Sequence, residues 1–262
     1  MPLVPNYSAE NCCFAYQLLW SFNLFWRGAP IADSWLAPLG QALGTDGIRV
    51  LEHRSPEFHV SQFLLSTLPT VAPQLIAQRV KGRLQFLIRA QDQHAFQRNY
   101  SLRSLGSTTR EKLQDYVAGQ LGHHEIAEPF LRWTLDDLRV IRPDVDLAQP
   151  RYTAHAQYSY NLHLVVERSD ISANFTTDQL TALRTMLIKA ANVKNHLLSR
   201  AAFLPDHLHW LIGCNPDESP QTVALSYLNN LDHALGMHSA FRLSAYLATF
   251  GEYDLRAIAA RR

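Results

Sequence analysis

The chain of 262 residues has little cysteine, little net charge and no long apolar segment, and each shortage excludes a class of protein. Its three cysteines, Cys12, Cys13 and Cys214, form no CxxC pair and no even set, which indicates a reducing compartment rather than a disulfide framework. The formal net charge is +1, so any surface for nucleic acid must be local. The apolar run 14–26 is interrupted by polar residues and is too short to cross a bilayer, so we expect a buried strand with its turn. The N-terminus also lacks the basic start of a secretory signal.

Apolar residues are plentiful, at 47% of the chain, which is enough for a large buried core. The length suits one large domain or two domains of about 100–150 residues each. Between residues 125 and 150 acidic residues outnumber basic ones, and three prolines occur (Pro129, Pro143 and Pro150). This composition is typical of a connector between two units.

The two halves of the chain repeat the same order of predicted elements. The corresponding segments are 15–20 and 159–164 (strands), 33–43 and 176–192 (helices), 48–66 and 197–214 (strand pairs), 72–90 and 220–235 (helices), 96–106 and 241–251 (strands), and 109–121 and 253–262 (helices). Thr177 or Asp178 is expected to cap the second-half helix. We therefore predict a first unit (1–124), a connector (125–152) and a second unit (153–262), each unit a sheet covered by helices.

The second unit contains Pro205-Asp206-His207-Leu208-His209-Trp210 on a predicted strand. The two-residue period places the imidazoles of His207 and His209 on one face, where they can share a divalent ion. On spacing alone, two packed or surface histidines are the better interpretation, and the position of the whole string in a duplicated unit favours a metal site. The matching string in the first unit offers either Phe58 and Val60, or His59 and Ser61, so one ligand or both are lost there.

The first unit instead keeps a tyrosine and a glutamine after its last strand. Tyr116 follows Gly106 by ten residues, and Gln120 comes one helical turn later on the same face. The position that matches Tyr116 in the second unit is Arg261. Tyr246 and Tyr253 are rivals that lie too early relative to Gly251. A core or interface tyrosine and a solvated glutamine are the alternatives for this pair.

The Pro-Asp-His-Leu-His-Trp-Leu string, the order of elements and the Tyr-x-x-x-Gln pair resemble the single-tyrosine HUH transposases, the small insertion-sequence and REP-associated tyrosine transposases. The resemblance implies an α+β fold of two ferredoxin-like (RRM-like) βαββαβα units, with sheets merged as in the family homodimer. It implies that His207, His209 and Gln120 hold Mg²⁺ or Mn²⁺. Tyr116 would be the nucleophile, and Asp206 would support the ligands or contact DNA.

The resemblance also implies a function: nicking and strand transfer of single-stranded DNA through a 5′-phosphotyrosine, at one composite site. The chain would act as a monomer, an internal pseudo-dimer, on single-stranded DNA with a hairpin, in a prokaryotic cytoplasm at the nucleoid and with no membrane. Arg79, Lys81 and Arg83 resemble the family's basic stretch and would bind DNA. Two alternatives are a domesticated, catalytically inactive DNA-binding protein and an unrelated metal hydrolase that uses a water nucleophile.

Overall fold

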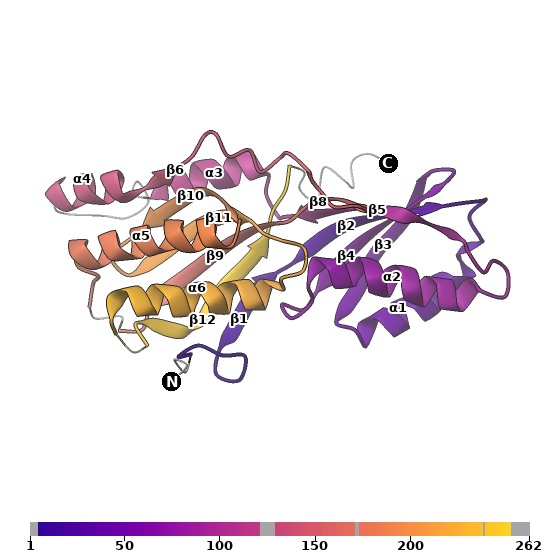
Figure 1. Cartoon of the computed structure of the whole chain (residues 1–262), viewed down its shortest axis with the longest axis horizontal. Helices are drawn as coiled ribbons and strands as arrows, with labels where there is room; N and C mark the ends of the chain where they lie inside the picture. The colour runs from indigo at the N-terminus through magenta and orange to yellow at the C-terminus, as the bar shows by residue number, and fades with distance from the viewer. Residues whose placement is uncertain (1–4, 121–128, 171–172, 238, 253–262) are drawn as a thin grey trace.

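A computed structural model describes residues 5–120, 129–170, 173–237 and 239–252 (Figure 1). The fold is mixed α/β with two six-stranded sheets, and the first has the order β3-β4-β2-β5-β8-β7. Its strands are β3 (Ile48–Glu57), β4 (Val60–Thr67), β2 (Leu19–Trp26), β5 (Phe96–Leu105), β8 (Ala156–Ser159) and β7 (Arg151–Tyr152). The second sheet has the order β1-β12-β9-β11-β10-β6. Its strands are β1 (Cys13–Gln17), β12 (Phe241–Thr249), β9 (Asn161–Arg168), β11 (His207–Gly213), β10 (Leu197–Phe203) and β6 (Val140–Ile141).

Helices cover one face of both sheets, and one further helix lies across the other face of the second sheet (Figure 1). The covering helices are α1 (Leu36–Gly44), preceded by a 3₁₀ turn (Asp33–Trp35), α2 (Pro73–Ile88), α5 (Thr177–Val193) and α6 (Pro220–Leu235). The helix on the opposite face is α3 (Arg110–Ala118), and α4 (Pro129–Leu138) lies against β10 and α5. In the second sheet Trp210 packs against Tyr227 of α6, so the neighbouring residue His209 faces α3.

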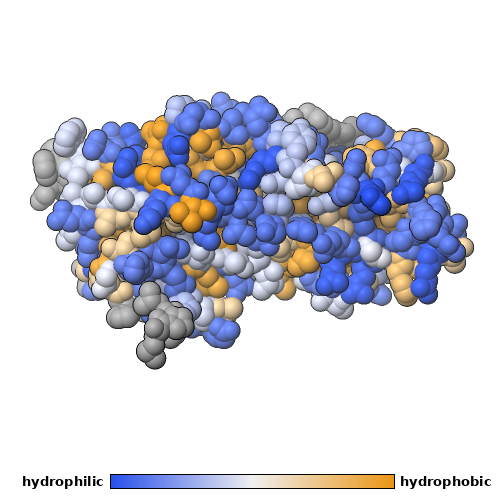
Figure 2. All heavy atoms as spheres, in the orientation of Figure 1, coloured by the Kyte–Doolittle hydropathy of each residue, from blue (hydrophilic) through white to orange (hydrophobic). Residues whose placement is uncertain are grey.

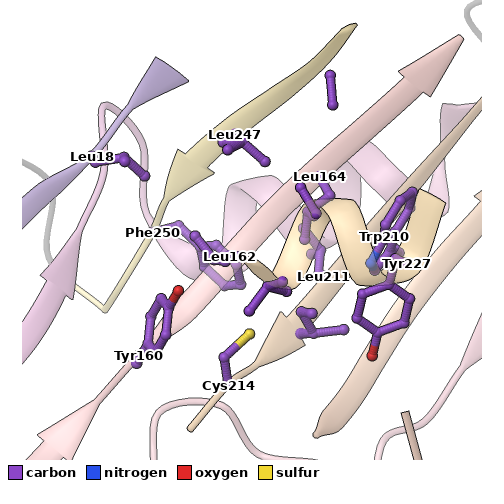
Figure 3. Close-up of a cluster of buried hydrophobic side chains, with 14 of the residues drawn as sticks. Leu18, Tyr160, Leu162, Leu164, Trp210, Leu211, Cys214, Tyr227, Leu247 and Phe250 are labelled. Carbon is purple, nitrogen blue, oxygen red and sulfur yellow. The ribbon is translucent and has the colours of Figure 1, made fainter. Parts of the chain in front are cut away.

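Each unit contributes a strand to the sheet of the other. β1 pairs in parallel with β12 of the second unit, and the chain then passes through Leu18 into β2 of the first sheet. In the same way β8 pairs in parallel with β5, and the chain passes through Tyr160 into β9. Leu18 and Tyr160 lie in the buried cluster at this crossing (Figure 3). The expected turn within 14–26 is therefore wrong, and two linked sheets take the place of one merged sheet.

Reciprocal backbone hydrogen bonds join the two halves of the chain. Gln74 N donates to Pro216 O at 2.8 Å, and Gln221 N donates to Pro69 O at 2.9 Å. Likewise Thr67 N donates to Leu18 O, and Cys214 N donates to Tyr160 O. Leu18 thus corresponds to Tyr160 and Thr67 to Cys214, and the sequence alignment of these strands is wrong by two residues.

Two glycines meet where the last strand of each unit ends. A Cβ atom at Gly106 would lie 2.9 Å from the carbonyl oxygen of Thr249, and one at Gly251 would collide with the carbonyl oxygen of Ser104. Arg110 N then donates to Gly251 O at 2.7 Å. The backbones approach too closely for a side chain at either position, which explains why both residues are glycine. The same approach directs the chain after Gly106 onto the sheet of the second unit.

The predicted helices and strand pairs are largely confirmed, with shifted ends. Thr176, rather than Thr177 or Asp178, caps α5, because its side chain and that of Gln179 form a capping box. The helix expected over 253–262 lies outside the described residues. All three cysteines are free thiols. Within the described part of the chain, no helix has the length and apolar character needed to cross a membrane. The surface over α1 and α2 is mainly hydrophilic (Figure 2).

Candidate active site

Two histidines project from β11 toward α3. His207 and His209 alternate with Leu208 and Trp210, which are buried on the helix-covered face. The rings of His207 and His209 lie 4.9 Å apart with an interplanar angle of 70°. The strand therefore places both imidazoles on one face, as its two-residue period predicts.

Each of these histidines has a defined partner on its Nδ1 atom. His207 Nδ1 lies 2.6 Å from Asp206 Oδ1, and His209 Nδ1 lies 3.1 Å from His163 Nε2. The repeat over 159–164 did not single out His163, although His163 alternates with Val165 and Glu167 and therefore shares a strand face with them. Burial lowers the pKa of His163 to about 4, so this imidazole is neutral near pH 7.

Tyr116 reaches this histidine cluster from the other unit. Its ring centroid lies 6.0 Å from that of His209, in an edge-to-face arrangement with an interplanar angle of 80°. α3 is held on the second sheet by buried Leu113 and Val117, and Gln114 Nε2 donates to Ser199 Oγ of β10 at 3.1 Å. The structure thus brings together Tyr116 of the first unit and His209 of the second.

Gln120 lies just beyond the end of α3. The helix expected over 109–121 ends at Ala118, followed by Gly119, and Arg139 Nη1 donates to the Ala118 carbonyl oxygen. Gln120 therefore lies outside the helix that carries Tyr116. Its side chain is nevertheless buried, and its Nε2 has no hydrogen-bond partner among the residues that the structure describes.

A pocket of about 450 Å³ opens beside the two histidines. It is lined by Val165, Glu167, Arg168, Asp206, His207, His209 and Arg242. Arg242 Nη1 forms an ion pair of 2.7 Å with Glu167 Oε2, and Arg168 Nη1 is buried with no hydrogen-bond partner in the described residues. The pocket lining therefore combines two guanidinium groups with the carboxylates of Glu167 and Asp206.

The rival tyrosine Tyr246 shares the same face of the sheet. It stands on β12 opposite Val165, and its ring lies 6.0 Å from that of His163. Burial raises the pKa of its phenol, which disfavours the phenolate. The other rival, Tyr253, lies outside the described residues.

The basic residues of α2 are not brought to this pocket. Arg79 and Arg83 form ion pairs with Asp46, at 3.6 and 3.1 Å. Lys81 Nζ donates to the carbonyl oxygens of Gln97 and Arg98. These three residues belong to the helix layer that covers the opposite face of the sheets (Figure 1), so any DNA contact there is separate from the histidines.

The equivalent place in the first unit carries no histidine. Strand pairing aligns Val60 with His207 and Gln62 with His209. The expected replacements, Phe58 and Val60 or His59 and Ser61, are therefore wrong, because β4 begins only at Val60 after the turn that contains Phe58 and His59. Neither of the two positions that match His207 and His209 carries a histidine in the first unit.

The donors present suit a divalent ion only in part. Two imidazoles on one face, one with a carboxylate on its Nδ1, have the arrangement common to histidine ligands, and Gln120 has a buried amide nitrogen without a described partner. No group of three or more His, Cys, Asp or Glu side chains that could hold a metal occurs among the described residues. An ion here would need an amide or a substrate oxygen to complete its ligands.

Comparisons with known proteins give distant likenesses only. No family model matches the chain, and no curated protein matches it. A REP-associated tyrosine transposase, solved bound to a REP hairpin, is similar over 39% of this chain and 61% of its own, with 13% identity and a TM-score of 0.32. An unknown protein from Galdieria sulphuraria is similar over 89% of this chain and 97% of its own, with 10% identity and a TM-score of 0.24. Likenesses this weak carry no argument about function.

Proposed function

We propose that the chain is two fused ferredoxin-like units that share one active site and nick and rejoin single-stranded DNA. The observation that carries the proposal is the contact between Tyr116 and His209, whose ring centroids lie 6.0 Å apart although they belong to different units. A phenol beside a pair of imidazoles combines a nucleophile with metal-binding groups. The unit that lacks the paired strand histidines supplies the phenol, and the unit that carries His207 and His209 supplies the pocket.

In the proposed reaction the Tyr116 oxygen attacks a DNA phosphorus and forms a 5′-phosphotyrosine. The phenolic proton passes to solvent, and the bond from phosphorus to the 3′-oxygen breaks to give a 3′-hydroxyl. Attack by another 3′-hydroxyl reverses the step and releases the phenol, so no external energy source is needed. His207, His209 and Gln120 would hold Mg²⁺ or Mn²⁺, which when bound would polarise the phosphate.

Other residues are proposed to hold the DNA. Arg168 and Arg242 line the histidine pocket and would contact phosphates next to the cleaved bond. Arg79, Lys81 and Arg83 would contact a hairpin on the helix-covered face, after Arg79 and Arg83 release Asp46. The whole chain would work as a monomer, because one polypeptide already supplies both parts of the site.

A labelled single-stranded oligonucleotide with a hairpin tests the reaction on a denaturing gel. The wild-type chain with Mn²⁺ or Mg²⁺ is expected to form a covalent protein–DNA adduct, and Tyr116→Phe is expected to form none. Tyr246→Phe is the matched control, because it removes the rival phenol on the same face and should leave the adduct intact.

Two other results would overturn the proposal in distinct ways. DNA binding without any adduct would identify a catalytically inactive DNA-binding protein. Cleavage that survives Tyr116→Phe but is lost in His207→Ala would identify a metal hydrolase with a water nucleophile.

A further inference from the structure

We infer that His163 is a positioning residue for His209: its Nε2 accepts the His209 Nδ1 proton and turns the His209 Nε2 toward the pocket. The inference rests on the proposed function, since it assigns His209 as a ligand through Nε2. His163 lies on β9, whereas His207 and His209 lie on β11, and the tautomer of His209 can be measured in the metal-free protein.

The geometry of the two rings carries the inference. His163 Nε2 and His209 Nδ1 are 3.1 Å apart, and the rings are stacked with an interplanar angle of 21° and centroids 5.3 Å apart. His163 and His209 are both buried, at 6% exposure each. A stacked, buried pair joined by one hydrogen bond fixes the planes of both rings and makes their tautomers complementary, so that one ring donates where the other accepts.

His207 receives the same support from a different group. Its Nδ1 lies 2.6 Å from a carboxylate oxygen of Asp206. If both Nδ1 atoms carry protons that are donated to partners, both imidazoles present Nε2 as the metal-binding atom. His163 therefore does for His209 what Asp206 does for His207, with a neutral acceptor in place of a charged one.

The first unit shows that this contact is built into the sheet. The positions equivalent to His163 and His209 are Ser21 and Gln62, and Gln62 Nε2 donates to Ser21 Oγ at 2.9 Å. The same diagonal hydrogen bond between neighbouring strands thus exists in both units. Only in the second unit are both partners of this hydrogen bond imidazoles. His209 lines the pocket, and His163 does not.

The first test is the tautomer of His209 in the metal-free protein, from the ring ¹⁵N shifts in NMR spectra, with His209→Gln to assign its signals. The inference expects a proton on Nδ1 of His209 in the wild type and in His163→Gln, whose amide oxygen accepts the same bond. It expects a mixture of tautomers in His163→Leu, which fits a buried site but accepts no hydrogen bond. A proton on Nε2 of wild-type His209, or an unchanged tautomer in His163→Leu, would overturn it.

The second test is Mn²⁺ affinity, measured by electron paramagnetic resonance without DNA. His163→Leu is expected to weaken Mn²⁺ binding about 10- to 100-fold, His163→Gln to restore most of the affinity, and Ser21→Ala in the first unit to change nothing. Equal affinity in wild type and His163→Leu would overturn the inference. Failure of the proposed function is distinguishable, because a protein that binds Mn²⁺ in this pattern without forming a DNA adduct retains the positioning role and loses only the reaction.

Discussion

The two units place different side chains on three equivalent positions of their two sheets. In the second unit His209 lies between His163 on one neighbouring strand and Ala202 on the other. In the first unit Gln62 lies between Ser21 and Arg54, donates to Ser21 and accepts from Arg54 Nε at 2.6 Å. The Gln62 side chain of the first unit is thus bonded to both neighbouring strands, whereas a pocket opens beside His209 in the second unit. One backbone arrangement can therefore be either a closed polar contact or an open site, depending on three side chains.

The two units also differ in the segment that each contributes to the sheet of the other. α3 of the first unit crosses onto the second sheet, where Tyr116 meets His209. The corresponding segment of the second unit lies outside the described residues, and Arg261 occupies the position that matches Tyr116. The histidine motif occurs only in the second unit and the tyrosine only in the first, and both lie beside the same pocket.

The largest effect is expected when the second unit is given the side chain of the first. His209→Gln should abolish the covalent DNA adduct and strongly weaken Mn²⁺ binding, because it removes one of the two imidazoles proposed as ligands. Gln62→Ala, the matched change in the first unit, should leave both unchanged. The denaturing gel and Mn²⁺ titration measure both variants, and a His209→Gln protein that still forms the adduct would contradict the difference between the units.

A smaller loss is expected when the room beside His209 is filled. Ala202→Arg copies Arg54 of the first unit and brings a positive charge next to the proposed ligands, so adduct formation and Mn²⁺ affinity should each fall at least about 10-fold. Arg54→Ala removes a half-buried hydrogen bond and should change the free energy of unfolding by about 1 kcal/mol without affecting the adduct. Normal activity in a folded Ala202→Arg protein would show that the space opposite His209 has no role.

The two units should also differ in the pH dependence of stability. His163 has a pKa of about 4 in the folded protein, against an ordinary value of 6.5, because it is buried. Its stabilising contribution is complete above pH 6.5 and is lost as the pH falls toward 4, since the unfolded chain takes up a proton that the folded chain excludes. The full loss is roughly 3 kcal/mol.

Urea unfolding at pH 7, 5.5 and 4 measures this loss of unfolding free energy. His163→Leu should show a smaller fall in unfolding free energy over this range than the wild type, whereas Ser21→Leu should keep the wild-type fall. Parallel curves for wild type and His163→Leu would mean that His163 does not titrate as its burial predicts.

The junction of the units gives the smallest expected effect. Gly251→Ala should destabilise the fold by about 1–3 kcal/mol, and Gly106→Ala by less, because the added methyl group meets the backbone of the other unit. Gly82→Ala is the control: it lies within α2 with open space around it, so it should stabilise by about 0.5–1 kcal/mol. Thermal unfolding ranks the three variants, and a neutral Gly251→Ala would show that the close approach is not needed.

Much of the fold follows from the sequence because periodic patterns act locally. The helix over 220–235 has the predicted bounds, and the strand pairs of both units occur as expected. The predicted alignment of the units was wrong by two residues, because the two proline-acid pairs that resemble each other lie in different places: Pro56-Glu57 ends β3, whereas Pro205-Asp206 lies in the turn between β10 and β11. Pairing register depends on contacts between strands, which no local pattern records.

The sequence by itself determined that His207 and His209 share one face, because side chains alternate along a strand, and that Tyr116 follows a strand-ending glycine. The family resemblance, rather than a local pattern, implied one composite site, and only the tertiary structure decided that His163 bonds His209. It also placed the basic residues of α2 on the opposite face. These relations join residues far apart along the chain, and packing of two whole sheets, rather than any local preference, sets their distances.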